Sequence, residues 1–343
     1  MDPISEVKQF ISRARSGSVK RMFKLARQAH KASGKPTAFI FADMASCIIR
    51  YGIGYQEYIS YGFVNKPERL RKTFMTMSHN IALTRALCDR DLYPVFEDKV
   101  TFLKTFSDYI GRDWIDVRES TPEEVAEFVR DHAVIFAKPT DNFGGQGIER
   151  LDGGVAPENP STFRDGLLAK GQVLLEEGIV QHPEMSRLCA SSINTIRVVT
   201  VVSQGKAHHI YSLVRMGMGD SFVDNISSGG MYTWVDDDGM LRYPCFHDKT
   251  ASYIDVHPKT GVAIKGFQIP LYREAVDMCL EAALVEPRIG YVGWDVAITP
   301  DRPVLVEGNL IPGYDMPQTE AFHPDGMGIL PVFEEALGFP VPR

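Results

Sequence analysis

The chain has 343 residues, 44% of them hydrophobic and 24% charged, so it can bury a full core and is typical of a globular protein. Its net charge of -7 comes from interspersed acidic and basic residues, so charge predicts neither a nucleic acid nor a membrane as an obligatory partner. We interpret the locally basic stretch 20–35 as a solvated helix face, with a polyanion or membrane surface as the less favoured alternative.

The five cysteines are widely spaced and include no Cys-x-x-Cys pair, which argues against both a disulfide framework and a zinc site. No apolar run approaches the roughly 20 residues that a membrane span requires, and the N-terminus has no signal-peptide core. We therefore expect a cytoplasmic protein without a membrane span. The sequence leaves the oligomeric state open.

The first part of the chain has the apolar spacing of helices over 4–33 and 64–90. The segment between them is rich in tyrosine and contains Gly52, Gly54 and Gly62. We predict a helix-rich N-terminal region over 1–95, with recognition of a substrate or partner as its role.

Further along, helices and strands alternate. Thr121 and Pro122 predict a helix start, and the short apolar runs 133–137 and 173–176 predict buried strands. Alternating stretches at 195–202 and 207–214 predict a hairpin, followed by a helix near 271–285 and two strands joined by 299–303. This succession predicts an α+β fold.

The last two strands place three oxygen-bearing side chains together. Alternation over 291–298 puts Asp295 on the face opposite Val292 and Trp294, while Glu307 and Asn309 share one face of the next strand. If the strands pair as a hairpin, the three side chains converge as hard ligands that suit magnesium on a polyphosphate. The alternative is an edge hairpin whose polar face meets water.

A second motif combines a lysine with glycines. Lys138 ends an apolar strand and is followed by Gly144, Gly145 and Gly147, which can bring backbone N–H groups against phosphate oxygens. The loop matches neither the standard phosphate loop nor the dinucleotide fingerprint, and an ordinary hairpin turn is the alternative.

Two further features are compatible with nucleotide binding. Glu176 and the backbone of Ile179 could hydrogen-bond an adenine, and a simple strand end is the alternative interpretation. Arg197 and Arg215 lie on predicted strands, where a buried guanidinium needs an anionic partner, either a ligand or a structural carboxylate.

Six segments, in order, resemble the ATP-grasp superfamily: Asp98-Lys99, Lys138-Pro139 with Gly144-Gly145-Gln146-Gly147, Glu176-Glu177-Gly178-Ile179-Val180, Asn194-Thr195-Ile196-Arg197, Asn225 to Gly230, and Asp295 with Glu307-Gly308-Asn309. The 12-residue step from Asp295 to Glu307 and the Glu-x-Asn pair are the most specific of these. The segments 55–63 and 98–106 are similar to the branch of sugar-transfer-associated ATP-grasp proteins.

The resemblance implies ATP held between two α+β lobes, a small lobe over 96–190 and a large lobe over 191–343. Its implied cofactors are ATP and two Mg²⁺ ions, with Mn²⁺ as the alternative metal. The implied nucleotide-binding residues are Lys99, Lys138, Gly144, Gly145, Gln146, Gly147, Glu176, Glu177, Ile179 and Val180. The implied metal ligands are Asp295, Glu307 and Asn309, and the implied catalytic residues are Arg197, Arg215, Asn225, Gly229 and Gly230.

The chain also departs from the superfamily pattern. Related glutamate ligases have an acid at the position of Thr195, so the ribose contact passes to His182 or Glu184. The N-terminal region lacks the alternating strand–helix pattern of the usual preceding domain, which predicts an unusual mode of substrate recognition.

The resemblance favours a carboxylate–amine ligase that forms an amide or peptide bond through an acyl phosphate and releases ADP and phosphate. Candidate substrates are amino acids, peptides and amino or uronic sugars. A phosphotransferase that makes a stable phosphoester is the second hypothesis, and a nucleotide-binding scaffold without turnover is the third. No Ser or Cys triad is evident.

Overall fold

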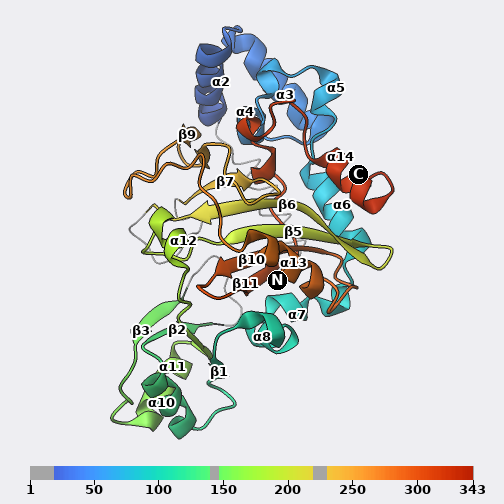
Figure 1. The fold of residues 1–343 in the computed structure, drawn as a ribbon. Coiled ribbons are helices and arrows are strands. Elements are labelled where there is room, and N and C mark those ends of the chain that lie inside the picture. Colours follow the sequence, from blue (N-terminus) through green and yellow to red (C-terminus); the bar gives the residue numbers. More distant parts are fainter. Residues whose placement is uncertain (1–18, 140–146, 219–229, 343) are drawn as a thin grey trace. The chain divides into compact units, whose positions relative to one another are not determined.

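The computed structural model describes residues 19–139, 147–218 and 230–342. By its internal contacts the chain divides into two compact units, one comprising 1–83, 313–335 and 339–343 and the other comprising 84–312 and 336–338. Figure 1 shows their elements, which combine helices with antiparallel sheets. The predicted α+β class is confirmed. No helix among the described residues is both long and apolar enough to cross a membrane.

The first unit is helical. Its elements are α2 (Val19–Ser33), α3 (Thr37–Tyr51), α4 (Tyr55–Ser60), η1 (Phe63–Asn65), α5 (Glu68–Arg71), the start of α6 (Met77–Leu87), η4 (Met316–Gln318), η5 (Glu320–Phe322) and most of α14 (Leu330–Leu337). The segment between the two expected helical stretches is itself largely helical. Its glycines lie at helix boundaries, where Gly52 ends α3 with φ of 69° and Gly54 precedes α4.

A buried amide fixes the C-terminal segment of this unit to the N-terminal segment. The Gln318 side chain donates to the carbonyl of Met75 at 3.0 Å and accepts from the Met75 N–H at 2.7 Å. Tyr314 donates its hydroxyl proton to the buried carboxylate of Glu57 at 2.6 Å. These bonds join residues more than 240 positions apart. The helical unit is therefore built from an N-terminal segment and the segment 313–335 together.

The second unit contains a four-stranded sheet in the order β1-β4-β2-β3, built from β1 (Trp114–Asp116), β2 (Val134–Lys138), β3 (Glu149–Asp152) and β4 (Leu174–Glu177). Helices α10 (Pro122–Asp131) and α11 (Pro160–Ala169) pack on it (Figure 1). Thr121 caps α10 as expected, because its hydroxyl accepts from the Glu124 N–H while the Glu124 carboxylate accepts from Thr121.

A seven-stranded antiparallel sheet of the same unit runs β11-β10-β5-β6-β7-β8-β9. Its strands are β5 (Ile196–Ser203), β6 (Lys206–Met216), β7 (Met231–Val235), β8 (Cys245–His247), β9 (Ser252–Ile254), β10 (Tyr291–Ile298) and β11 (Pro303–Asn309). Helix α13 (Tyr272–Ala282) packs against β5, β6, β10 and β11. The predicted hairpin joins β5 to β6 through Gln204 and Gly205, whose positive φ angles are typical of a tight hairpin turn.

The remaining helices of the second unit are η2 (Arg90–Leu92), α7 (Pro94–Glu97), α8 (Lys99–Thr105), α9 (Ser107–Ile110) and α12 (Pro183–Leu188). An aromatic cluster of Phe96, Phe102, Phe106 and Trp294 holds α7 and α8 against the strands that carry the candidate site, with ring centroids 4.7–5.8 Å apart. All five cysteines are buried thiols without disulfide bonds.

Candidate functional site

The β10–β11 hairpin brings the three candidate metal ligands together. Asp295 pairs in register with Glu307, and Gly293 pairs with Asn309. Strand β11 forms the edge of the sheet, but β10 lies inside it and Asp295 is only 1% exposed. A water-facing hairpin therefore does not describe Asp295, because a carboxylate this deeply buried requires charged or hydrogen-bonding partners.

Two arginines provide those partners. Arg197 lies opposite Asp295 on β5 and forms a bidentate ion pair with it, with Nη2 at 2.9 Å from Oδ2. Arg215 on β6 donates to the same Oδ2 at 2.7 Å and to the Thr195 hydroxyl at 2.8 Å. Burial opposes ionisation of Asp295, yet the two guanidinium groups hold its pKa well below the usual range.

A small residue makes room for this arrangement. A Cβ atom at Gly293 would lie 3.0 Å from Cδ of Arg197 and 3.1 Å from Pro312. The glycine that shares the Asp295 face in the sequence pattern thus leaves space for the arginine side chain. Sequence alternation predicted that Gly293 and Asp295 share a face. The reason for a glycine at this position becomes clear only from the Arg197 side chain that packs against it.

Glu307 differs from Asp295 in its protonation. Its side chain reaches the surface, but desolvation by the surrounding protein, the charge of Asp295 and a hydrogen bond between the two carboxyl groups raise its pKa to about 7. The pair therefore takes up one proton as the pH falls through about 7. Two carboxyl groups that share a proton are a suitable donor pair for a divalent cation, which can take the place of that proton.

Asn309 completes the set of oxygen donors. Its Nδ2 group donates to the Gly293 carbonyl at 3.3 Å and lies 3.5 Å from Oδ2 of Asp295. This orientation commits the amide nitrogen and leaves Oδ1 as the ligand atom. Two carboxylates and an amide oxygen fit Mg²⁺ by donor chemistry, and Glu307 and Asn309 are the more accessible of the three.

The second group of charges lies at the four-stranded sheet. Lys138, the last residue of β2, forms an ion pair with Glu176 on the neighbouring strand β4. Arg112 donates to the other oxygen of Glu176, with Nε at 2.9 Å and Nη2 at 2.5 Å. Burial alone would raise the pKa of the Glu176 carboxyl group. The positive charges of Arg112 and Lys138 outweigh this effect and lower the pKa to about 2.

Arg112 also connects the two sheets of this unit. Its Nη1 donates to the Leu305 carbonyl at 2.7 Å and its Nη2 to the Val306 carbonyl at 3.3 Å, immediately before Glu307. The guanidinium is almost completely buried. Sequence reasoning missed this residue, since an arginine between a short helix and a three-residue strand carries no periodic or motif signal.

The structure places most of the other candidate nucleotide-binding and catalytic residues at or near the ends of helices and strands. Lys99 is the first residue of α8 and is half-buried, Glu177 ends β4, and Ile179 and Val180 follow it. Glu184 lies in the first turn of α12 and pairs with Arg187 at 2.6 Å. Gly147 is exposed with φ of 76°, and Gly230 is buried just before β7. Gly144, Gly145, Gln146, Asn225 and Gly229 lie outside the described residues.

Residues 162–325 match the sequence model of a family described as sugar-transfer associated ATP-grasp. The resemblance to the ATP-grasp superfamily is confirmed. The matched segment carries Glu176, both arginines and all three candidate metal ligands, whereas Lys138 and the first 161 residues precede it. A search of curated proteins gives no match.

Several solved ATP-grasp structures are similar at low sequence identity. The ligase PsnB complexed with a minimal precursor, Mg and ADP is 14% identical, with 66% of this chain and 54% of that chain covered and a TM-score of 0.36. D-cycloserine synthetase DcsG is 11% identical, with 73% of each chain covered and a TM-score of 0.43. D-alanyl-alanine synthetase A from Vibrio cholerae is 11% identical over 73% of this chain and 62% of that chain, with a TM-score of 0.40. The present chain thus spans about half the length of PsnB.

Proposed function

We propose that the chain is an ATP-dependent carboxylate–amine ligase. In this reaction an oxygen of the substrate carboxylate attacks the γ-phosphorus of ATP, and the bond to the bridging oxygen breaks to release ADP. The nitrogen of an amine then attacks the carbon of the acyl phosphate, and phosphate leaves as the amide forms. Candidate substrates are amino acids, peptides and amino or uronic sugars.

The observation that carries the proposal is the convergence of Asp295, Glu307, Asn309 and two arginines within the ATP-grasp segment. Asp295 holds Arg197 and Arg215 in fixed positions, so their charge is preorganised for an anionic reacting group. Two magnesium ions, bound through Asp295, Glu307 and Asn309, would neutralise the triphosphate charge. Orientation and electrostatics are then the main contributions of the protein, which is what phosphoryl transfer requires.

The ion pair of Lys138 with Glu176 supports a nucleotide role for the four-stranded sheet. Glu176 directs the Lys138 ammonium group at the end of β2, just before the glycine-rich loop, where it would meet phosphate oxygens. Glu176, Glu177, Ile179 and Val180 would contact the adenine, and Glu184 or His182 the ribose. Lys99, at the start of α8, would contact the phosphates together with Lys138.

The phosphotransferase and scaffold hypotheses predict different products from those of a ligase. A phosphotransferase keeps the phosphoryl group on its product, so ADP forms without an amine and without free phosphate. A nucleotide-binding scaffold produces no ADP. The presence of three candidate metal ligands together with two arginines favours an enzyme, because binding alone does not need a preorganised cationic pair beside the metal ligands.

The deciding experiment supplies the purified chain with Mg²⁺-ATP and a panel of amino acids, amino sugars and uronic acids, alone and in pairs. A ligase releases equal amounts of ADP and phosphate only with an acid and an amine together, and the adduct mass is that of the two substrates less water. ADP without phosphate supports the phosphotransferase. The absence of ADP with every pair, when ATP still binds, supports the scaffold.

A further inference from the structure

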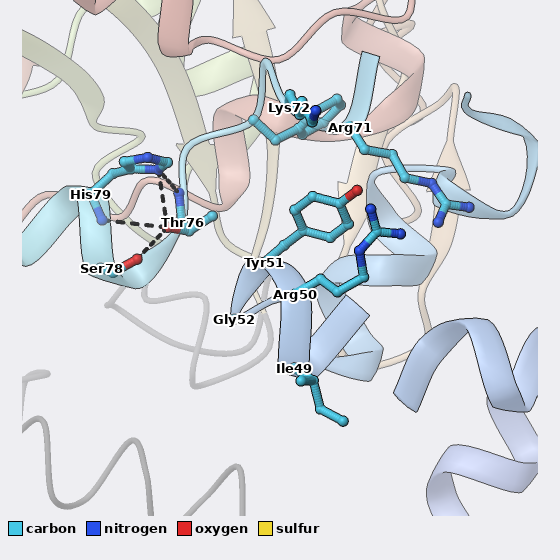
Figure 2. Close-up of a pocket in the computed structure, with 10 residues that line it drawn as sticks. Ile49, Arg50, Tyr51, Gly52, Arg71, Lys72, Thr76, Ser78 and His79 are labelled. Carbon is cyan, nitrogen blue, oxygen red and sulfur yellow. Dashed lines mark hydrogen bonds between the residues drawn. The ribbon is translucent and has the colours of Figure 1, made fainter. Parts of the chain in front are cut away.

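The helical unit contains a cavity of about 220 Å³ between the end of α3, helix α5 and the start of α6. A water molecule occupies about 30 Å³ of liquid, so the cavity has room for a small organic group. Figure 2 shows its lining, which includes Arg50, Tyr51, Lys72, Thr76, Ser78 and His79. All these residues precede the ATP-grasp segment and lie in one compact unit.

The lining of the cavity has an excess of positive charge. Arg50 and Lys72 both pair with the single carboxylate of Glu68, at 2.8 Å and 3.3 Å. Their side chains are 50% and 58% exposed, so they are able to turn toward a ligand. Two cations that share one carboxylate leave about one unit of charge to be balanced.

The third cation of the lining, Arg71, has a structural role. Its guanidinium group forms a bidentate pair with Asp43 at 2.6 Å and 2.8 Å, and it also donates to the Phe63 and Lys66 carbonyls. Its Nη1 also donates to Sγ of Cys47 at 3.5 Å, so these five contacts use the whole donor set of the side chain. Arg71 therefore shapes the wall of the cavity, while Arg50 and Lys72 remain the charges that a ligand can recruit.

Tyr51 has a buried hydroxyl group without a hydrogen-bond partner among the described residues. Leaving such a group unpaired destabilises the folded state, because the hydroxyl group has lost its hydrogen bonds to water. In Figure 2 its ring lies among the side chains of Arg50, Arg71 and Lys72, and the Arg50 guanidinium lies 5.2 Å from the ring centre. The hydroxyl group therefore keeps its full hydrogen-bonding capacity for a bound group.

The opposite side of the cavity carries hydroxyl groups at a helix start. The Thr76 hydroxyl lies 2.8 Å from that of Ser78 and 3.0 Å from Nδ1 of His79. Helix α6 begins at Met77 and has 11 residues, so its dipole is positive at this end. The charge, the hydroxyl groups and the helix start all favour an oxyanion.

We propose that this cavity binds a small molecule through an oxyanion group, either a phosphate or a carboxylate. Arg50 and Lys72 supply the balancing charge, and the hydroxyl groups of Tyr51, Thr76 and Ser78 supply hydrogen bonds. The proposal does not depend on the ligase function, since every group belongs to the helical unit and binding is measured without ATP.

The test measures binding to the full chain by calorimetry and by the shift of the unfolding temperature, with inorganic phosphate, glucuronate and neutral glucose as probes. We expect phosphate or glucuronate to bind and glucose to fail, and the better of the two anions identifies the oxyanion. Lys72→Gln should weaken binding about tenfold, because a charge-assisted hydrogen bond is lost. Arg69→Gln is the matched control, since it removes the same charge from the exposed side of α5 outside the cavity.

Tyr51→Phe gives the most specific signature. Without an anion, the variant should unfold at the same or a higher temperature than wild type, because an unpaired hydroxyl is removed. With the anion, it should lose most of the stabilisation that wild type gains. The proposal is overturned if no anion binds to wild type, or if Tyr51→Phe and Lys72→Gln bind it as tightly as Arg69→Gln does.

Discussion

At the scale of single residues, Asp295 and Glu307 illustrate how position separates two carboxylates on one hairpin. Asp295 is enclosed by Arg197 and Arg215 and stays ionised, whereas Glu307 has the ionised Asp295 beside it and takes up a proton as the pH falls through about 7. The sequence shows both as acids on paired strands. Only the neighbouring strands decide which one carries the charge.

This difference predicts that the two carboxyl groups contribute unequally to stability. Asp295→Asn leaves two nearly buried guanidinium groups without a counter-charge and should lower the free energy of unfolding by about 3–5 kcal/mol. Glu307→Gln replaces a carboxyl group whose pKa is about 7 with a neutral amide, and should change the free energy of unfolding at pH 7 by less than about 1 kcal/mol. Urea unfolding at pH 7 measures both values, and equal losses in the two variants would contradict the assigned charges.

Glu57 gives the helical unit a dependence on pH. Burial raises its pKa from 4.5 to about 7, although the Tyr314 hydroxyl and the Gly54 N–H donate hydrogen bonds to the carboxylate. The pKa of Glu57 is higher in the folded state than in the unfolded state, so protonation of this group stabilises the folded protein. The stabilisation is complete below pH 4.5 and is lost as the pH rises through about 7.

Comparison with Glu57→Gln isolates this effect from other titrations. The difference in unfolding free energy between wild type and variant should shift by about 3 kcal/mol between pH 4.5 and pH 8, with wild type losing stability as the pH rises. Chemical denaturation across this range is the measurement. A difference that stays constant with pH would show that Glu57 keeps one protonation state.

At the scale of elements, β11 depends on a glycine where it meets α7 and α8. A Cβ atom at Gly308 would lie 2.6 Å from Phe96 and 2.9 Å from Phe102. Both rings pack in the aromatic cluster with Phe106 and Trp294, so they have little room to retreat. Gly308 therefore allows the strand segment with Glu307 and Asn309 to pack directly against α7 and α8, and α8 begins at Lys99.

Gly308→Ala should cost about 1–3 kcal/mol of stability through overpacking. Gly166→Ala is the control, because this glycine lies within α11 and an added methyl group would meet open space. That variant should gain about 0.5–1 kcal/mol from its higher helix propensity. Thermal unfolding of both variants checks the pair, and a Gly308→Ala protein as stable as wild type would refute the close approach.

Local pattern was sufficient for several elements. Thr121 and Pro122 predicted the start of α10, the alternation around Asp295 predicted the face it occupies, and Gly205 predicted the β5–β6 turn. The individual helices within 34–63 were not predicted, because Gly52, Gly54 and Gly62 and the nearby tyrosines resemble loop composition in the sequence, whereas they mark helix ends and a buried core.

At the scale of the whole molecule, the sequence does not reveal contacts that depend on distant strands and helices. Arg112 meets Glu176 and Leu305 across 64 and 193 positions, and Gln318 meets Met75 across 243. Such partners are chosen by the tertiary arrangement and leave no local spacing. The ATP-grasp motifs predicted the candidate residues of the site, but not Arg112, which connects its two groups of charges.

The central claim is that Asp295, Glu307 and Asn309 hold the metal of a magnesium–ATP site. Calorimetric titration of the full chain with ATP, in Mg²⁺ and in EDTA, tests it most directly. We expect metal-dependent binding by wild type and by Asp301→Asn, whose exposed carboxylate lies in the turn of the same hairpin. Glu307→Gln should weaken metal-dependent binding at least tenfold. Equal affinity in Glu307→Gln and wild type, or binding that is indifferent to Mg²⁺, would contradict the account.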